Sequence, residues 1–146
     1  MSDCIALAEI HASAFKRGWS DAEFEALLLQ SGVHALIAHY RNAFGWRMPA
    51  GFILYRLATD EAEILSVAVA PQCRRRGIGR VLLEDALRHL YREGVRSIHL
   101  EVEDSNLAAI GLYRGVEFRE SGRRAGYYTQ GRETPAGALV MLRQLR

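Results

Sequence analysis

Cysteine is scarce in this chain. Cys4 and Cys73 are far apart and form no C-x-x-C pair. A disulfide framework or a zinc finger needs several cysteines at short, regular spacings. The sequence therefore predicts neither, and it favours a reducing, cytoplasmic compartment. The histidines show no metal-ligand spacing, so we also expect no metal site.

The chain also lacks an excess of either charge and any long apolar run. Its 19 Lys and Arg nearly balance 17 Asp and Glu, for a net charge of +2, which argues against a nucleic-acid-binding protein. No run of about 18 apolar residues exists, so we expect no membrane span. The first residues include Asp3 and Glu9 and no apolar core segment, so we expect no signal peptide.

What is present is an uninterrupted globular pattern. The 146 residues contain no repeat, low-complexity tract or linker, and this length fits one domain spanning residues 1–146. A chain of this size buries roughly 68–70% of its unfolded surface, enough for a hydrophobic core.

Helical and strand patterns alternate along the chain. Residues 4–15 predict a short helix, and residues 19–32 predict a second. In the second, Ser20 and Glu23 have the capping-box spacing and Gly32 is the stop. Apolar runs bounded by turn residues predict strands at 33–40, 50–58, 61–71, 96–104, 117–124 and 137–145. We expect a helix from Asn106 to Arg114 and a loop at 125–135.

The clearest helix follows three consecutive arginines and ends at Gly94. Its apolar face is predicted to consist of Ile78, Val81, Leu82, Leu87, Leu90 and Tyr91. The near-continuous apolar run at 61–71 predicts a strand covered on both faces. With the alternating strand at 96–104, residues 63–103 form a strand–helix–strand unit, whose strands should be parallel. One parallel pair among hairpins predicts an α/β fold with a mixed, mostly antiparallel sheet and helices on both faces.

The stretch "RRRGIGRVLL" at the start of that helix allows several interpretations. A helix N-terminus offers free N–H groups and partial positive charge to an anion, and Gly77 and Gly79 would let a phosphate approach the backbone. The glycines could instead only start the helix, and the arginines could be a solvated basic run. A P-loop is excluded because no GK[ST] follows. A Rossmann fingerprint fits poorly because Leu82 occupies its third glycine position, although Glu101 lies some twenty-odd residues further on.

The residues resemble motif A of the GCN5-related N-acetyltransferase (GNAT) family. "SVAVAPQCRRRGIGRVLL" has the family's V-x-V-x-P strand end followed by [QR]-x-x-G-x-[GA], here Arg74-x-x-Gly77-x-Gly79. "LEVEDSNLAAIGLYRGVEF" continues the resemblance, which runs from about Ile10 to the end of the chain. Within the family, "IHLEVEDSNLAAIGLY" and "RRAGYY" are most similar to the bacterial RimI type, whose members acetylate the N-terminal alanine of ribosomal protein S18.

The resemblance implies acetyl-coenzyme A as co-substrate, with no metal. Its pyrophosphate would lie on the backbone N–H groups of residues 75–80, which are Arg75, Arg76, Gly77, Ile78, Gly79 and Arg80. The strand at Val67, Ala68 and Val69 would pair with the pantetheine arm, and its backbone N–H would stabilise the thioester oxygen. Asn106 would also face the cofactor, two helical turns from Tyr113.

Two residues match the family's catalytic pair, Glu101 as general base and Tyr113 as general acid. Each residue also has a non-catalytic interpretation. Glu101, which shares a strand face with His99 and Glu103, could belong to a solvated face, and Tyr113 could be an aromatic residue of the core. Glu103 is the second candidate for the base. By the same resemblance, Tyr127, Tyr128 and Trp19, with Phe15, would hold the substrate peptide.

Three departures from the family pattern stand out. The family opens with a strand before its first helix, and here that edge strand is missing or lies upstream. Glu117 replaces the glycine of L-Y-x-x-x-G-F, so Gly115 could cap the helix instead. The segment before the last strand also lacks a common acidic residue.

We therefore expect an N-terminal peptide acetyltransferase that acts on S18, without nucleic acid or membrane, as a monomer or weak dimer. An acetyltransferase of small amines and a non-catalytic acyl-coenzyme A binder are the alternatives.

Overall fold

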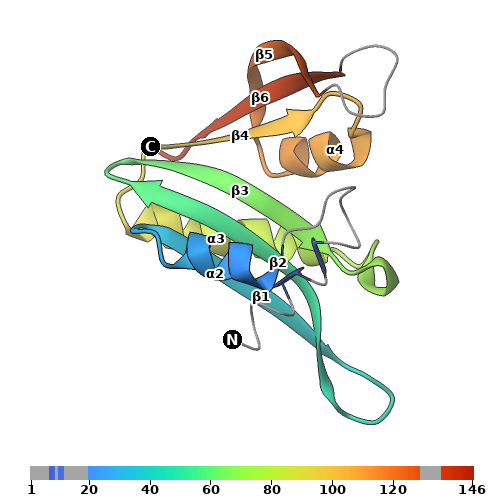
Figure 1. Cartoon of the computed structure of the whole chain (residues 1–146). Coiled ribbons are helices and arrows are strands. Elements are labelled where there is room, and N and C mark those ends of the chain that lie inside the picture. The colour runs from blue at the N-terminus through green and yellow to red at the C-terminus, as the bar shows by residue number, and fades with distance from the viewer. Residues whose placement is uncertain (1–6, 9, 12–19, 129–135) are drawn as a thin grey trace.

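The computed structural model describes residues 7–8, 10–11, 20–128 and 136–146, and of 124–128 and 136 it describes the backbone. Figure 1 shows the elements. The helices are α2 (Asp21–Leu28), the 3-10 turn η1 (Pro71–Cys73), α3 (Ile78–Arg92) and α4 (Leu107–Gly115). The strands are β1 (Val33–Arg41), β2 (Arg47–Ala58), β3 (Glu61–Val69), β4 (Ser97–Glu103), β5 (Arg119–Tyr128) and β6 (Ala136–Gln144).

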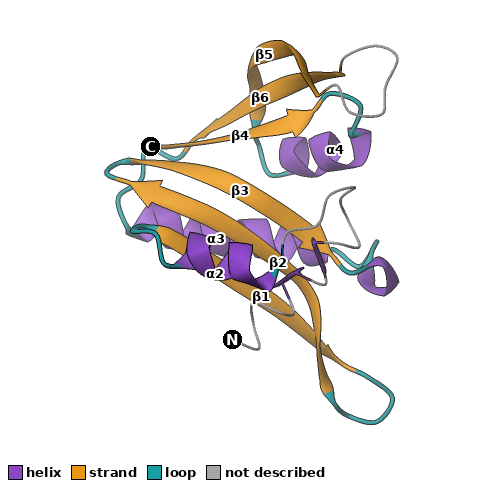
Figure 2. Cartoon of the chain, in the orientation of Figure 1, coloured by secondary structure: helices purple, strands orange, loops and turns teal. Residues whose placement is uncertain are grey.

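The strands form one six-stranded sheet in the order β1-β2-β3-β4-β6-β5. β3 and β4 are parallel and are connected through α3, whereas the other neighbours are antiparallel. The predicted strand–helix–strand unit and mixed sheet are therefore confirmed. In Figure 2, α2 and α3 lie on opposite sides of the sheet.

Two hydrophobic clusters cover the two faces. The larger joins α3 and α4 to one face of the sheet and includes Ile64, Leu83, Leu100 and Tyr113. The smaller lies on the α2 side and includes Phe24, Leu54 and Ala68. Because Ile64 and Ala68 belong to different clusters, β3 is covered on both faces, as its apolar run predicts.

The pairing between β3 and β4 is short. It consists of three residue pairs and ends at Glu63 opposite His99. Each strand continues beyond that pair, β3 to Val69 and β4 to Glu103, and Figure 1 shows the two strands diverging there. Beyond that pair, the facing edges of β3 and β4 are not joined to each other by ladder hydrogen bonds.

Local signals placed several element ends correctly. The Ser20 side chain accepts a hydrogen bond from the Glu23 backbone N–H at 3.1 Å, which caps α2. Gly94 follows α3 with a φ of 84°. Four residues of the helix expected at 4–15, numbers 7, 8, 10 and 11, are helical. The rest of that helix and the question of an earlier strand lie outside the described residues.

Three expectations were wrong. Val81 and Tyr91 are 55% and 50% exposed, and Leu83 and Ala86 occupy the buried face of α3 instead. β5 extends to Tyr128 because it pairs with β6 as far as Ala136, so residues 125–128 are strand rather than loop.

The third concerns the end of α4. Gly115 is the last helical residue, and Glu117 takes the left-handed turn with a φ of 70°.

Candidate active site

The start of α3 presents a cradle of backbone N–H groups. Gly77 caps the helix with a φ of 77°, and a Cβ added to it would meet nothing within 4 Å. The first hydrogen bond of the helix runs from the Val81 N–H to the Gly77 carbonyl. The N–H groups of Ile78, Gly79 and Arg80 precede it and have no acceptor within the helix. This end therefore suits an anion.

Gly79 has a packing role that the sequence interpretation missed. It is buried, and a Cβ there would lie 3.1 Å from Leu112 Cδ2 of α4. The second glycine of the motif therefore lets α3 and α4 approach closely, whereas open space beside Gly77 leaves room for a ligand.

The arginines around the cradle have different surroundings. Arg75 and Arg76 are exposed, and Arg75 has a φ of 64°. The Arg74 Nε donates to the Val69 carbonyl at 3.3 Å, which ties the loop to the end of β3. Arg80 is ion-paired with Glu84 at 2.8 Å. Arg75 and Arg76 are thus better placed for a further phosphate than Arg80.

The predicted co-substrate strand lies at the open edge of β3. Val67 packs against the cluster on the α3 side, and Ala68 belongs to the cluster on the α2 side. With Val69, these residues pair on one edge with Gly51 to Ile53 of β2. On their other edge the β4 ladder has already ended, so the backbone there is available to a ligand.

Glu101 and Tyr113 lie on opposite faces of the sheet. Leu100 and Val102 point into the cluster on the α3 side, and strand alternation puts the half-buried Glu101 on the α2 side. Tyr113, from α4, lies within the cluster on the α3 side and is 8% exposed. Burial raises the pKa of its phenol to about 12, so the hydroxyl keeps its proton at neutral pH.

Asn106 caps α4 instead of lying inside it. Its side-chain oxygen accepts a hydrogen bond from the Ala109 N–H at 3.2 Å. Its amide NH₂ is the group it can offer to a ligand while the cap is intact.

The substrate residues are only partly covered. Tyr127 and Tyr128 are the last two residues of β5. Trp19 and Phe15 lie outside the described residues.

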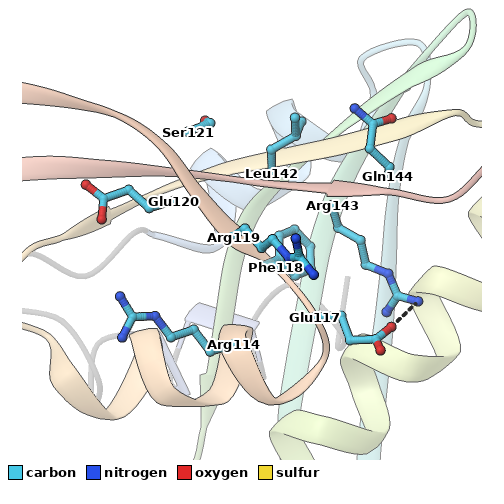
Figure 3. A pocket seen from close by; sticks show the side chains of 9 residues that line it. All are labelled: Arg114, Glu117, Phe118, Arg119, Glu120, Ser121, Leu142, Arg143 and Gln144. Carbon is cyan, nitrogen blue, oxygen red and sulfur yellow. Dashed lines mark ion pairs between the residues drawn. The ribbon is translucent and has the colours of Figure 1, made fainter.

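Two cavities lie away from these residues. Figure 3 shows one of about 560 Å³ between the end of α4 and strands β5 and β6, where Glu117 and Arg143 form an ion pair. The other, of about 640 Å³, lies between β1 and α3. None of the predicted site residues lines either cavity. The residues on β3 and β4 lie instead beyond the end of the ladder that joins these two strands.

The described part of the chain holds no group of three or more His, Cys, Asp or Glu side chains arranged to bind a metal ion. Among the same residues, no helix has the length and apolar character needed to cross a membrane.

Sequence comparison defines the class of protein. The acetyltransferase (GNAT) family matches residues 4–118, and the chain belongs to this family. The ribosomal protein bS18-alanine N-acetyltransferase of Escherichia coli K12 is 43% identical over 86 residues, 58% of this chain and 58% of that protein. The match thus spans less than two thirds of that relative. A Bacillus subtilis protein, provisionally described as the same enzyme, is 32% identical over 133 residues, 91% of this chain and 83% of its own.

Solved structures show the same fold. The crystal structure of the ribosomal-protein-S18-alanine N-acetyltransferase from Escherichia coli matches with a TM-score of 0.85 and 30% identity, covering 99% of this chain and 88% of that one. Arabidopsis thaliana NAA60, crystallised with a bisubstrate analogue, matches with a TM-score of 0.81 at 20% identity, covering 98% and 92%. This second likeness concerns the fold alone.

Proposed function

We propose that the protein transfers the acetyl group of acetyl-coenzyme A to the N-terminal α-amine of a protein, the alanine of ribosomal protein S18, in the cytoplasm. The observation that carries this proposal is the opening between β3 and β4, with Glu101 on one face of the sheet and Tyr113 on the other. A donor and an acceptor that approach from opposite faces can meet in such an opening. The names of the Escherichia coli and Bacillus subtilis relatives support the choice of acceptor.

The residues present fit acetyl-coenzyme A. The N–H groups of residues 75–80 would hold the pyrophosphate, with the space beside Gly77 left for it. The open edge of β3 at Val67 to Val69 would hydrogen-bond the pantetheine amides, and Asn106 would offer its amide NH₂. When bound, the co-substrate supplies an activated acetyl thioester.

Glu101 acts as the general base in this proposal. An α-amine has an ordinary pKa of about 7.7–8.0, against about 10.4 for lysine. A carboxylate, directly or through water, can therefore remove the proton from an α-amine near neutral pH without an extreme pKa. Specificity for a free N-terminus over lysine follows from the same difference.

Tyr113 stabilises the departing thiolate. A phenol with a pKa of about 12 is a weaker acid than a thiol, whose ordinary pKa is near 8.5. Complete proton transfer from Tyr113 to the sulfur is thus uphill. The protonated hydroxyl instead donates a hydrogen bond to the sulfur as the C–S bond breaks and keeps its own proton. The proton that Glu101 takes from the amine then passes to solvent.

Tyr127, Tyr128 and Trp19 would hold the backbone of the acceptor peptide. The supporting observation is that β5 continues through Tyr128, so the two tyrosines are carried on a hydrogen-bonded strand rather than on a long loop.

The test is mass spectrometry of peptides incubated with the protein and acetyl-coenzyme A. The panel contains an alanine-first S18 peptide, peptides with other first residues, and a peptide with a blocked N-terminus and a free lysine. We expect one acetyl group on the free α-amine, fastest for the S18 peptide, and none on the blocked peptide. Binding of coenzyme A without transfer to any peptide would overturn the proposal.

A further inference from the structure

Strand β1 forms one edge of the sheet and has none of the features that protect an edge strand. It is nine residues long and, among the described strands, it pairs with β2 only (Figure 1). Residues 33–40 contain no Lys, Arg, Asp, Glu, Gly or Pro. The irregularity in its ladder is an extra residue on β2, Ala50, so β1 itself is regular. Edge strands of this kind pair readily with another strand.

The opposite edge of the sheet, β5, is protected. It carries the charged residues Arg119, Glu120 and Arg123, and its ladder with β6 is interrupted after Glu120 and again after Arg124. Charges and bulges are the devices by which natural sheets prevent edge-to-edge association. The contrast between the two edges indicates that β1 is suited to being covered by a further strand.

A cavity of about 640 Å³ makes the edge of β1 accessible. All residues from His34 to His39 line it. Because consecutive residues of a strand point to alternate faces, the cavity borders the backbone edge of β1 rather than one face. Its other wall is a stripe on α3 at helical spacing, which consists of Val81, Asp85, Arg88 and Arg92. A strand added beside β1 would therefore also contact α3, where Val81 is 55% exposed.

We infer that the added strand is β1 of a second copy, so that the protein forms a two-fold dimer with one sheet running through both copies. Two identical antiparallel strands have their two-fold axis perpendicular to the sheet. With the axis at Ile37, the centre of β1, Leu36 faces Ala38 of the second copy and Arg41 faces Val33 of the second copy. No two charged side chains oppose each other across this strand pair.

The stripe on α3 is complementary to itself in the same arrangement. The two α3 helices lie on one face of the sheet and are antiparallel, so Asp85 of one copy faces Arg88 of the other, and Val81 faces the alkyl stem of Arg92. Within one copy Asp85 and Arg88 form an ion pair, and their side chains remain 49% and 63% exposed. A peptide of one charge sign would match only half of this stripe. The charge pattern therefore favours a second copy as the occupant.

The dimer interface lies away from the proposed active site. Strand β2 separates β1 from β3 in the sheet, so dimerisation leaves the facing edges of β3 and β4 uncovered in both copies. An interface made of one strand pair and one helix flank is at the small end of protein interfaces, so we expect a dimer Kd in the micromolar range. The inference does not depend on the proposed function.

The test is sedimentation velocity of the full chain at a series of increasing concentrations, where we expect a reversible monomer–dimer equilibrium. Asp85→Arg and Arg88→Asp should each raise the dimer Kd by about tenfold or more, because like charges then face each other across the axis. An equimolar mixture of the two variants should form a heterodimer about as tight as the wild-type dimer, because opposite charges face each other again. Restored association also shows that both variants are folded.

Arg123→Asp is the matched control. It makes the same change of charge on β5, at a side chain that is 59% exposed, and should leave the dimer Kd unchanged. Hydrogen exchange of the β1 amides should slow as the protein concentration rises. A monomer at every concentration, or a dimer that neither α3 variant weakens, would overturn the inference. Protection of the β1 amides in a monomer would overturn it too, because a segment of the same chain would then cover this edge.

Discussion

Glu101 and Tyr113 belong to opposite faces of one sheet, and Glu101 lies on β4 beyond the end of its ladder with β3. Under the proposed function, this relationship gives the two side chains different tasks, because they lie on opposite sides of the sheet. Single substitutions should therefore affect different steps of the reaction.

Replacing Glu101 should remove the chemical step while leaving co-substrate binding intact. General acid–base groups contribute about 10²–10⁴-fold to rates, so Glu101→Gln is expected to lower kcat by that range without a change in the Kd for acetyl-coenzyme A. Stopped-flow or mass-spectrometric rates and calorimetry measure the two quantities. Glu103→Gln is the matched control on the same strand face. If the larger loss occurs in that variant, or if Glu101→Gln keeps wild-type transfer across the pH range, Glu101 is not the base.

Because of the buried Tyr113 hydroxyl, the free energy of unfolding should fall as the pH rises above 10. The unfolded chain releases the phenol proton near pH 10, whereas the folded chain holds it until about pH 12. The contribution is therefore fully present below pH 10 and is lost as the pH rises towards 12. In Tyr113→Phe the free energy of unfolding should fall less steeply over this range. Burial also raises the pKa of Tyr55, so part of the slope should remain.

At neutral pH the same variant should fold normally and react slowly. The ring of Tyr113 lies 6.0 Å from that of Phe118, and phenylalanine keeps this packing. A fall in kcat of about 10²-fold or more is expected because the donor to the thiolate is lost. Wild-type kcat in Tyr113→Phe would rule out the assigned role.

Gly77 should matter for both folding and binding. With a φ of 77°, alanine at this position adopts a left-handed conformation that costs about 1–2 kcal/mol. Its methyl would also occupy the open space beside the helix end, so the Kd for coenzyme A should rise in calorimetry. Gly111→Ala is the control: it lies within α4 with nothing near its Cβ and should raise the free energy of unfolding by about 0.5–1 kcal/mol. Equal coenzyme A affinities in both variants would contradict the cradle.

Glu117 stores strain in the turn after α4. Its φ is 70°, and its carboxylate is held by Arg143 at 3.2 Å (Figure 3). Glu117→Gly and Glu117→Ala lose this ion pair equally, but only alanine keeps a Cβ. The glycine variant should therefore be the more stable of the two by about 1 kcal/mol in urea unfolding. An alanine variant of equal or greater stability would show that the backbone is not strained there.

Short-range signals account for what the sequence predicts well. The cap at Ser20 and the stop at Gly94 depend on chemistry within one helical turn, and both were placed correctly. The position of the buried stripe on α3 was less well determined. Val81 and Tyr91 are apolar but lie at its borders, whereas Leu83 and Ala86 are buried against the sheet. The periodicity of apolar residues shows that α3 has a buried stripe. Which residues lie at the middle of that stripe depends on how the helix packs against the sheet.

Long-range pairing accounts for what the sequence alone could not predict. Alternation along 96–104 assigns Glu101 to a polar face, but only the structure shows that the β3–β4 ladder ends at His99, before Glu101. The continuation of β5 through Tyr128 depends on its pairing with β6, across residues that are distant in sequence.

The three residue pairs that join β3 to β4 leave the sheet incomplete at its centre. A ligand that hydrogen-bonds to the open edge of β3 would therefore replace missing ladder contacts, and binding it would raise the stability of the folded chain by mass action. An edge without a ladder can also pair with a strand from another molecule. Saturation with co-substrate should therefore raise the melting temperature of the protein and slow its aggregation.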